Sequence, residues 1–150
     1  MFTIVLVEPD IPQNTGNIAR LSAANDFNLV LTGKLGFELT DRYLKRAGLD
    51  YWEYVNIKHI PNKEDYLNSL DISKIHLFSR FAETAYTEME AKSGDYFIFG
   101  SETGGLPEQF KKKHCNQCYK IPMKNPKVRS LNLATSVGIV MYHALYLNGT

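Results

Sequence analysis

Short apolar runs alternate with helical patterns along the whole chain. This alternation predicts an α/β fold with a mostly parallel sheet covered by helices on both faces. The chain has 150 residues, which suffice for one compact domain but not for two of ordinary size. Apolar residues make up 44% of it and charged residues 22%, close to the globular average, so the composition argues against disorder. We therefore expect residues 1–150 to form a single domain.

The chain begins with the pattern of a strand, a helix and a second strand. Residues 2–7 (FTIVLV) and 28–32 (NLVLT) have the length and β-branched content of buried strands. Between them, apolar residues at helical spacing predict a helix over residues 16–26. Asn14 and Thr15 precede this helix and can accept hydrogen bonds from its free amide groups, so we expect them to cap it.

The next segment predicts two short helices around a strand. Residues 40–47 favour a helix that begins at a Thr40 cap and ends at Gly48. Residues 54–60 alternate between polar and apolar side chains as a half-buried strand does. A helix over residues 62–70 follows, capped by the asparagine at its start.

The second half continues the alternation. Residues 75–78 predict a strand, and residues 84–92 predict a helix. Residues 96–99 form an aromatic-rich strand pattern. A short helix is expected over residues 107–113, because proline is favoured in the first turn of a helix.

The chain closes with a strand over residues 118–121 and a helix over residues 131–146. Ser130 stands where it can cap this helix. The helix is apolar on most of its sides, and a helix of that kind at the end of a chain indicates a partner surface as well as core. Tyr142 and His143 are therefore expected at an interface.

Four loops are expected to gather at one edge of the sheet. In parallel sheets, ligands bind where the carboxyl ends of the strands and their loops meet. The loops predicted at that edge comprise residues 8–16, 78–83, 100–107 and 122–130.

Residues 100–107 (GSETGGLP) form the loop with the most glycine. Three glycines allow a tight turn and a close approach of backbone to a ligand. The loop has neither the Lys-Ser/Thr ending of a phosphate-binding P-loop nor the Gly-x-Gly-x-x-Gly spacing of a dinucleotide site. Phosphate cradling, and with it a nucleotide-dependent metabolic enzyme, is therefore disfavoured. Glu102 in this loop either orders neighbouring backbone amides or faces a cation, with simple exposure as the alternative.

Asn17 and Arg20 are three residues apart, so they share one face of the first predicted helix, near its start. Arg20 is suited to bind a phosphate or a developing oxyanion. The alternative for Arg20 is a surface ion pair with Asp26 or Glu8.

Charge is distributed unevenly along the chain. Residues 1–108 carry ten basic and all 16 acidic side chains, whereas residues 109–150 carry seven basic side chains and no acidic ones. A basic segment between Lys111 and Arg129 suits a polyanionic partner, and a solvated surface is the alternative.

The sequence gives little support for a metal site, a redox pair or export. Cys115 and Cys118 form a Cys-x-x-Cys pair without a second pair to complete a zinc site, so we expect reduced thiols and no metal. Residues 2–7 lack the flanks of a signal peptide, and polar residues interrupt the last apolar stretch. We expect a cytoplasmic protein with no membrane contact.

Taken together, three motifs resemble those of the SPOUT (SpoU–TrmD) RNA methyltransferases. They are NTGNIAR after the first strand, FGSETGGLP in the glycine-rich loop, and IPM…RSLNLATSVGI at the last helix. The segment GFELTDRYLKRAGLDYW at residues 36–52 resembles the small TrmL-type branch of that family. The resemblance spans essentially the whole chain.

This resemblance implies a SPOUT fold whose C-terminal part forms a deep trefoil knot, and a homodimer. It also implies that S-adenosyl-L-methionine is the cofactor, bound largely by backbone groups and without a metal. The matching cofactor-binding positions are Phe78, Gly100, Ile121, Ser130 and Leu131.

The resemblance further implies an RNA ribose 2′-O-methyltransferase. Members of the branch act as tRNA (cytidine/uridine-34)-2′-O-methyltransferases on the wobble nucleotide of leucine tRNAs, so the expected partner is the tRNA anticodon stem-loop. Lys111, Lys112 and Arg129 are expected to bind its phosphates. The matching catalytic arginine is Arg20, with Asn17 and Glu102 orienting it or the target nucleotide.

Two positions depart from the family pattern. Relatives usually carry Arg or Lys where Gly104 stands, and a Thr-Lys-Gly-like turn where this chain has residues 79–82 (SRFA). Arg80 can supply the charge of that lysine. These differences bear on the choice of substrate, and two other activities stay open: 2′-O-methylation at another tRNA or rRNA site, and non-catalytic RNA binding on the same fold.

Overall fold

The computed structural model describes every residue of the chain except 41, 43, 45, 47–50 and 150. The strands and helices are bounded as follows: β1 (Thr3–Val7), α1 (Pro12–Asn25), β2 (Asn28–Thr32), β3 (Asn56–Ile60), α3 (Lys63–Ser69), β4 (Ile75–Phe78), β5 (Thr84–Ala85), β6 (Tyr96–Phe99), α4 (Glu108–Lys113), β7 (Cys118–Lys120) and α5 (Leu133–Leu147). Short 3₁₀ turns lie at Trp52–Tyr54, Ile72–Lys74, Tyr86–Glu88 and Cys115–Gln117.

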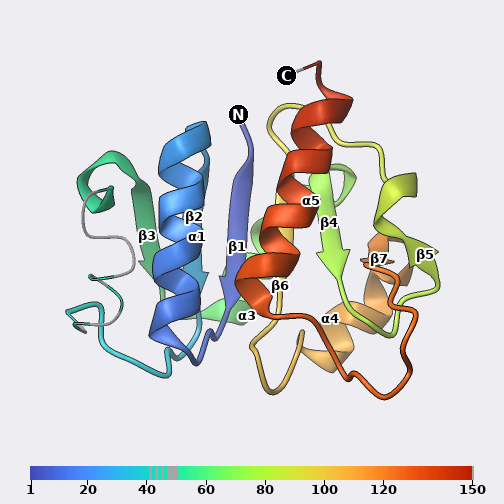
Figure 1. Cartoon of the computed structure of the whole chain (residues 1–150), viewed down its shortest axis with the longest axis horizontal. Helices are drawn as coiled ribbons and strands as arrows, with labels where there is room; N and C mark the ends of the chain where they lie inside the picture. The colour runs from blue at the N-terminus through green and yellow to red at the C-terminus, as the bar shows by residue number, and fades with distance from the viewer. Residues whose placement is uncertain (41, 43, 45, 47–50, 150) are drawn as a thin grey trace.

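The seven strands form one sheet in the order β3-β2-β1-β6-β4-β7-β5, and the paired strands run parallel. The register aligns the ends of the central strands: Val7 of β1 is paired with Thr32 of β2, and Phe78 of β4 is paired with Phe99 of β6. Their carboxyl ends therefore meet along one edge, which is the lower edge in Figure 1. The predicted fold class is confirmed.

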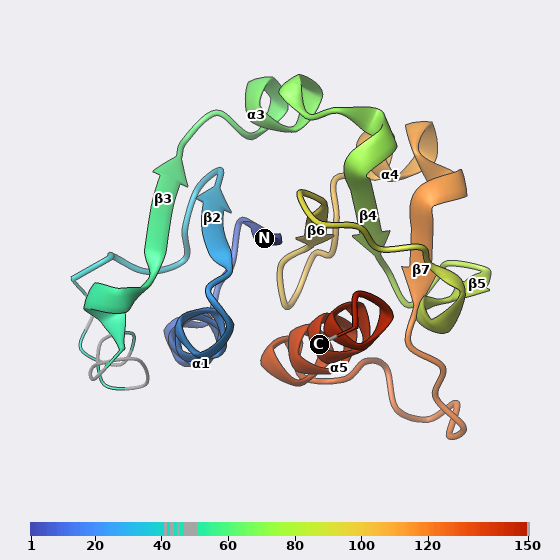
Figure 2. The ribbon, with the colours of Figure 1, turned by 90° about the horizontal axis from the view of Figure 1, so that it is seen from above.

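Helices cover both faces of this sheet (Figure 2), because alternate residues of each strand point to opposite sides. On one face, Ile4 and Leu6 of β1 pack in a core with α1 and α5. On the other face, Val5 and Val7 of the same strand pack with Leu67 of α3 and Phe110 of α4. The central strands are thus buried on both sides, which explains their continuous apolar runs.

The helix predicted over residues 84–92 is wrong. Residues 84–92 form the short strand β5 and a 3₁₀ turn rather than a helix. Thr84 and Ala85 pair with Tyr119 and Lys120 of β7, so sheet pairing overrides the local helical pattern. The helix predicted over residues 40–47, with its Thr40 cap and Gly48 end, falls largely outside the described residues. The knot stays a prediction, because strand order alone does not define one.

The starts of α1 and α5 also differ from the prediction. Helix α1 begins at Pro12 rather than at residue 16, so Asn14 and Thr15 lie buried inside its first turns and do not cap it. Proline at the first helical position explains this earlier start. Asn132 rather than Ser130 caps α5, and its side chain accepts a hydrogen bond from the Thr135 amide. Asn62 does cap α3, as predicted.

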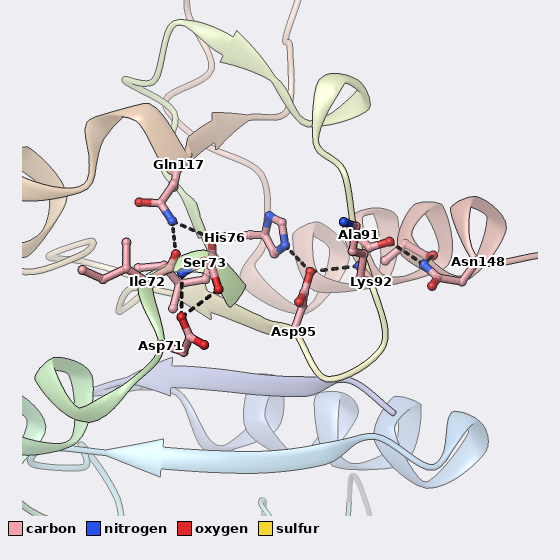
Figure 3. Close-up of polar contacts among 11 residues, drawn as sticks. Asp71, Ile72, Ser73, His76, Ala91, Lys92, Asp95, Gln117 and Asn148 are labelled. Carbon is pink, nitrogen blue, oxygen red and sulfur yellow. Dashed lines mark hydrogen bonds and ion pairs between the residues drawn. The ribbon is translucent and has the colours of Figure 1, made fainter.

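A buried polar pair joins β4 to the turn before β6 (Figure 3). His76 Nε2 lies 2.7 Å from Asp95 Oδ2, and both side chains are less than 9% exposed. The same carboxylate oxygen accepts a hydrogen bond from the Lys92 amide at 2.9 Å. The His76 ring stacks on Phe97, with 5.0 Å between the ring centroids. Asp95 therefore pairs with one buried and one partly buried nitrogen at the end of the sheet opposite the loops described above.

Replacing Asp95 is expected to destabilise the fold. The Asp95→Ala variant leaves the His76 ring nitrogen and the Lys92 amide without their partner, at a cost of about 2–4 kcal/mol in the free energy of unfolding. Urea unfolding followed by circular dichroism measures this change. Glu64→Ala, at an exposed position on α3, is the control and is expected to stay within about 0.5 kcal/mol of the parent. Equal stability of both variants would contradict the role given to Asp95.

Candidate functional site

A cleft of about 880 Å³ lies where the four predicted loops meet. Each loop contributes residues to its lining, including Asn14, Phe78, Gly100 and Ser130. The prediction that these loops converge is confirmed. Its physical basis is the parallel register, which brings the ends of β1, β4 and β6 to one edge.

The glycine-rich loop forms one wall of the cleft, and its shape depends on Gly100. A short antiparallel bridge joins Ser101 to Gly105, and Gly105 has a φ of +67°, in the region that favours glycine. The Ser101 hydroxyl accepts a hydrogen bond from the Gly104 amide at 2.8 Å. A Cβ on Gly100 would stand 2.0 Å from the Gly105 carbonyl carbon, so only glycine fits there.

The tight fit at Gly100 gives a testable contrast with Gly138 in α5. The Gly100→Ala variant forces the loop apart and is expected to lower the free energy of unfolding by about 1–3 kcal/mol. Within its own chain a Cβ on Gly138 meets nothing within 4 Å, so Gly138→Ala is expected to leave the stability of the single chain unchanged or raise it by about 0.5–1 kcal/mol. Urea unfolding of both variants checks the contrast, and a Gly100→Ala protein as stable as the parent would refute it.

Glu102 connects this loop to the start of α1. Its two carboxylate oxygens accept hydrogen bonds from the backbone amides of Asp10 at 2.8 Å and Ile11 at 2.9 Å. No side chain of the helix itself caps α1. A carboxylate at a helix N-terminus also interacts favourably with the helix dipole. Of the interpretations offered by the sequence, ordering of backbone amides is therefore the one the structure confirms for Glu102.

The network continues from Glu102 to the start of α5 through two asparagines. Asn14 donates its side-chain amide to Glu102 at 3.1 Å, and its oxygen accepts from the Asn132 side chain at 3.0 Å. A carboxylate only accepts hydrogen bonds, so the Asn14 NH₂ group must face Glu102. The Asn132 oxygen is then free to accept from the Thr135 amide at 3.1 Å, which caps α5. One chain of hydrogen bonds thus joins the glycine-rich loop to two helix N-termini.

Removing the Glu102 carboxylate is expected to weaken the contact between the glycine-rich loop and the start of α1. Glu102→Ala loses three charge-assisted hydrogen bonds at a partly exposed position, so we expect a loss of about 1–3 kcal/mol in unfolding free energy. Hydrogen exchange is expected to show faster exchange of the Asp10 and Ile11 amides. Glu64→Ala, at the first turn of α3, is the matched control. Unchanged exchange at Asp10 and Ile11 would rule out the connecting role of Glu102.

All five predicted cofactor positions line the cleft: Phe78, Gly100, Ile121, Ser130 and Leu131. Two of the three predicted RNA-binding residues, Lys111 and Arg129, line it as well, whereas Lys112 is exposed on α4 outside the lining. Sequence reasoning missed the aromatic wall formed by Phe99 and Tyr119, although Phe99 directly precedes a predicted loop and Tyr119 lies two residues before Ile121.

Arg20 and Asn17 lie outside the cleft lining, exposed on α1. The Arg20 guanidinium lies over the Tyr51 ring, 4.9 Å from its centroid. The alternative ion pair with Glu8 is not formed, because Glu8 pairs with Lys63 and accepts a hydrogen bond from the Lys34 amide. These contacts lower the pKa of Glu8, the Lys63 hydrogen bond most strongly.

The lining of the cleft fits an adenosine-type ligand with a thioether or sulfonium. Phe78, Phe99 and Tyr119 supply an aromatic wall, with Phe78 and Phe99 stacked at 4.7 Å between centroids. The cradle at Gly100 exposes backbone where a side chain could not fit. Within the described part of the chain, no group of three or more His, Cys, Asp or Glu side chains could hold a metal ion.

Cys118 is buried at the start of β7, and burial raises the pKa of its thiol.

The helices of the described residues include none long and apolar enough to cross a membrane.

Comparison with known proteins places the chain in one family of methyltransferases. Residues 1–142 match the model of the SpoU rRNA Methylase family. The chain therefore belongs to the SpoU methylase family, in agreement with the resemblance found in its motifs.

Similar proteins extend this match over nearly the whole chain. A tRNA (cytidine(34)-2′-O)-methyltransferase of Aeromonas hydrophila is 40% identical over 145 residues, which cover 96% of this chain and 92% of that protein. A Lactococcus lactis protein, provisionally given the same name, is 47% identical over 146 residues, covering 95% and 86% of the two chains.

Solved structures give the same picture. One, described as giving insights into the 2-OH methylation of C/U34 on tRNA, superposes with a TM-score of 0.90 at 41% identity, covering 99% of this chain and 96% of that one. The SpoU methyltransferase AviRb from Streptomyces viridochromogenes, in complex with AdoMet, has a TM-score of 0.85 at 18% identity and shares the fold over 97% of this chain and 57% of its own.

Proposed function

We propose that this protein transfers a methyl group from S-adenosyl-L-methionine to the ribose 2′-oxygen of nucleotide 34, the wobble position, in leucine tRNAs. It acts in the cytoplasm as a homodimer. The observation that carries the proposal is the convergence of all five cofactor positions on one cleft beside a basic rim. Relatives at 40–47% identity that bear the name of this activity support the same substrate class.

The cofactor would be held by backbone and apolar groups rather than by charged side chains. Gly100 and Ile121 offer backbone groups to the cleft, and Phe78 offers an apolar wall. Ser130 and Leu131 border the same space just before α5 begins. When bound, the cofactor supplies a methyl group that is already activated by its sulfonium charge, so the protein needs to align the reacting groups and assist loss of the 2′-OH proton.

Dimer formation would bring Arg20 of one chain to the cleft of the other chain. Arg20 and Asn17 are exposed on α1 and do not line the cleft of their own chain. Helices α1 and α5 lie side by side on one face (Figure 2), and Tyr142 and Tyr146 of α5 are 55% and 75% exposed there. In our proposal this α1/α5 face joins two copies, and Arg20 of one chain acts beside the cofactor of the other.

Arg20 is proposed to bind the developing 2′-alkoxide and an adjacent phosphate. A guanidinium rarely gives up its proton, so Arg20 is poorly suited to act as a general base. Its planar set of donors suits an oxyanion, and the proton would leave to phosphate or water. Glu102 and Asn14 fix the start of α1 and thereby position the helix that carries Asn17 and Arg20.

The Arg20→Ala variant is expected to lower kcat by at least about 100-fold, because a donor to a developing oxyanion is lost. Affinity for S-adenosyl-L-methionine is expected to stay at the parent value, since Arg20 is not among the five positions proposed to hold the cofactor. Single-turnover methyl transfer together with calorimetric titration of the cofactor separates the two effects. Near-normal turnover with intact cofactor binding would disprove this role of Arg20.

The proposed activity is tested by incubating purified protein with unmodified total tRNA and methyl-labelled S-adenosyl-L-methionine, followed by nucleoside mass spectrometry. We expect label in 2′-O-methylcytidine or a 2′-O-methyluridine derivative at position 34 of leucine tRNAs. Label only at other tRNA positions would assign the activity to another tRNA site, and label in rRNA but not in tRNA, in a parallel incubation with rRNA, would make rRNA the substrate. Cofactor binding without label in any RNA would favour a non-catalytic RNA-binding role.

A further inference from the structure

Phe81 is an exposed aromatic residue at the rim of the cleft. It follows the carboxyl end of β4, lines the cleft and is 70% exposed. Two cations lie against its ring: the Arg80 guanidinium is 4.4 Å and the Lys111 ammonium 5.4 Å from the centroid. Lys111 also pairs with Glu108 at 3.3 Å. An exposed aromatic side chain among cations matches the usual surface for single-stranded nucleic acid, where bases stack and phosphates pair with charge.

The backbone around Phe81 is tied down on both sides. The Ser79 amide donates to the Tyr119 carbonyl at 2.9 Å, and the Ala82 amide donates to the Ser79 carbonyl at 3.1 Å. The Phe81 amide donates to the Ser79 hydroxyl at 3.2 Å. Arg80 donates to the Arg129 carbonyl, which connects this turn to the basic segment before α5. An ordered backbone turn therefore presents the Phe81 ring to solvent. Because this backbone is already fixed, it loses little conformational entropy when a ligand stacks on the ring.

We propose that Phe81 is a stacking platform for a nucleobase of the RNA substrate next to the nucleotide being methylated, with Arg80 and Lys111 binding the flanking phosphates. This inference rests on the proposed function. The cofactor is a less suitable occupant of the rim, because its sulfonium carries a positive charge that Arg80 and Lys111 would repel. The inner cleft offers the cofactor the buried wall of Phe78 and Phe99 instead.

A stacking role predicts which substitutions matter. Phe81→Ala is expected to weaken RNA binding roughly 5- to 100-fold. Phe81→Leu keeps an apolar side chain but removes the π face and is expected to bind nearly as weakly, whereas Phe81→Trp restores or exceeds parent affinity. Tyr54→Ala is the matched control. Tyr54 is also an exposed aromatic residue, at 69%, but it lies just before the amino end of β3, whereas the cleft lies at the carboxyl ends of the strands.

The experiment measures binding of a fluorescein-labelled leucine tRNA anticodon stem-loop by anisotropy, with the full-length protein saturated with S-adenosyl-homocysteine and over a range of salt concentrations. We expect the Phe81→Ala affinity to fall while the salt dependence keeps the parent slope, because stacking releases no counterions. Affinity for S-adenosyl-homocysteine alone, measured by calorimetry, is expected to be the same for all variants.

Three results would overturn the platform. The first is an RNA affinity of Phe81→Ala equal to that of the parent protein. The second is a smaller salt dependence of RNA binding in Phe81→Ala, which would mean that Phe81 only supports Arg80. The third is a loss of S-adenosyl-homocysteine affinity in Phe81→Ala alongside the loss of RNA affinity. Methylation assays run alongside keep the two proposals apart. Stacking by Phe81 with no methyl transfer by the parent protein would contradict the proposed function, and methyl transfer unaffected by Phe81→Ala and Phe81→Leu would contradict the platform.

Discussion

The functional site depends on one carboxylate, that of Glu102. The glycine-rich loop after β6 and the start of α1 are 88–92 residues apart in sequence, and Glu102 holds them together through three hydrogen bonds. Asn14 passes the connection to Asn132, which in turn caps α5. Glu102 can only accept hydrogen bonds because it is a carboxylate, and this determines which atom of each following side chain donates and which accepts. Two of the four cleft loops and the start of α5 are thereby fixed relative to one another.

The sheet supplies the frame on which this connection is possible. A parallel register over β2, β1, β6 and β4 brings their carboxyl ends to one edge, so segments distant in sequence emerge side by side (Figure 1). Gly100 then lets the chain turn back within contact distance of Gly105, where any side chain would collide. The cleft is consequently lined by backbone and aromatic rings, together with the Glu102 carboxylate and the basic side chains of Arg80, Lys111 and Arg129.

Much of this arrangement could be predicted from the sequence, because it follows from local patterns. Short apolar runs, and in one case an alternating pattern, predict six of the seven strands, and their parallel order implies where the loops gather. Residues 84–92 were predicted wrongly as a helix because their spacing is helical while pairing with β7, a long-range effect, decides their conformation. The partner of the α1 N-terminus could not be predicted for a similar reason, because it is Glu102, far along the chain. The earlier start of α1 has a local cause, Pro12. At α5, Ser130 and Asn132 are both residues that can cap a helix, and the structure uses Asn132.

The central claim is that this backbone-lined cleft holds the methyl donor. A crystal structure of the protein with bound S-adenosyl-homocysteine tests it most directly. Our account predicts the ligand between the glycine-rich loop and residues 121–131, with hydrogen bonds to backbone groups of Gly100, Ile121 or Leu131 and contacts with Phe78. A ligand bound elsewhere on the surface, or one held mainly by charged side chains, would contradict it.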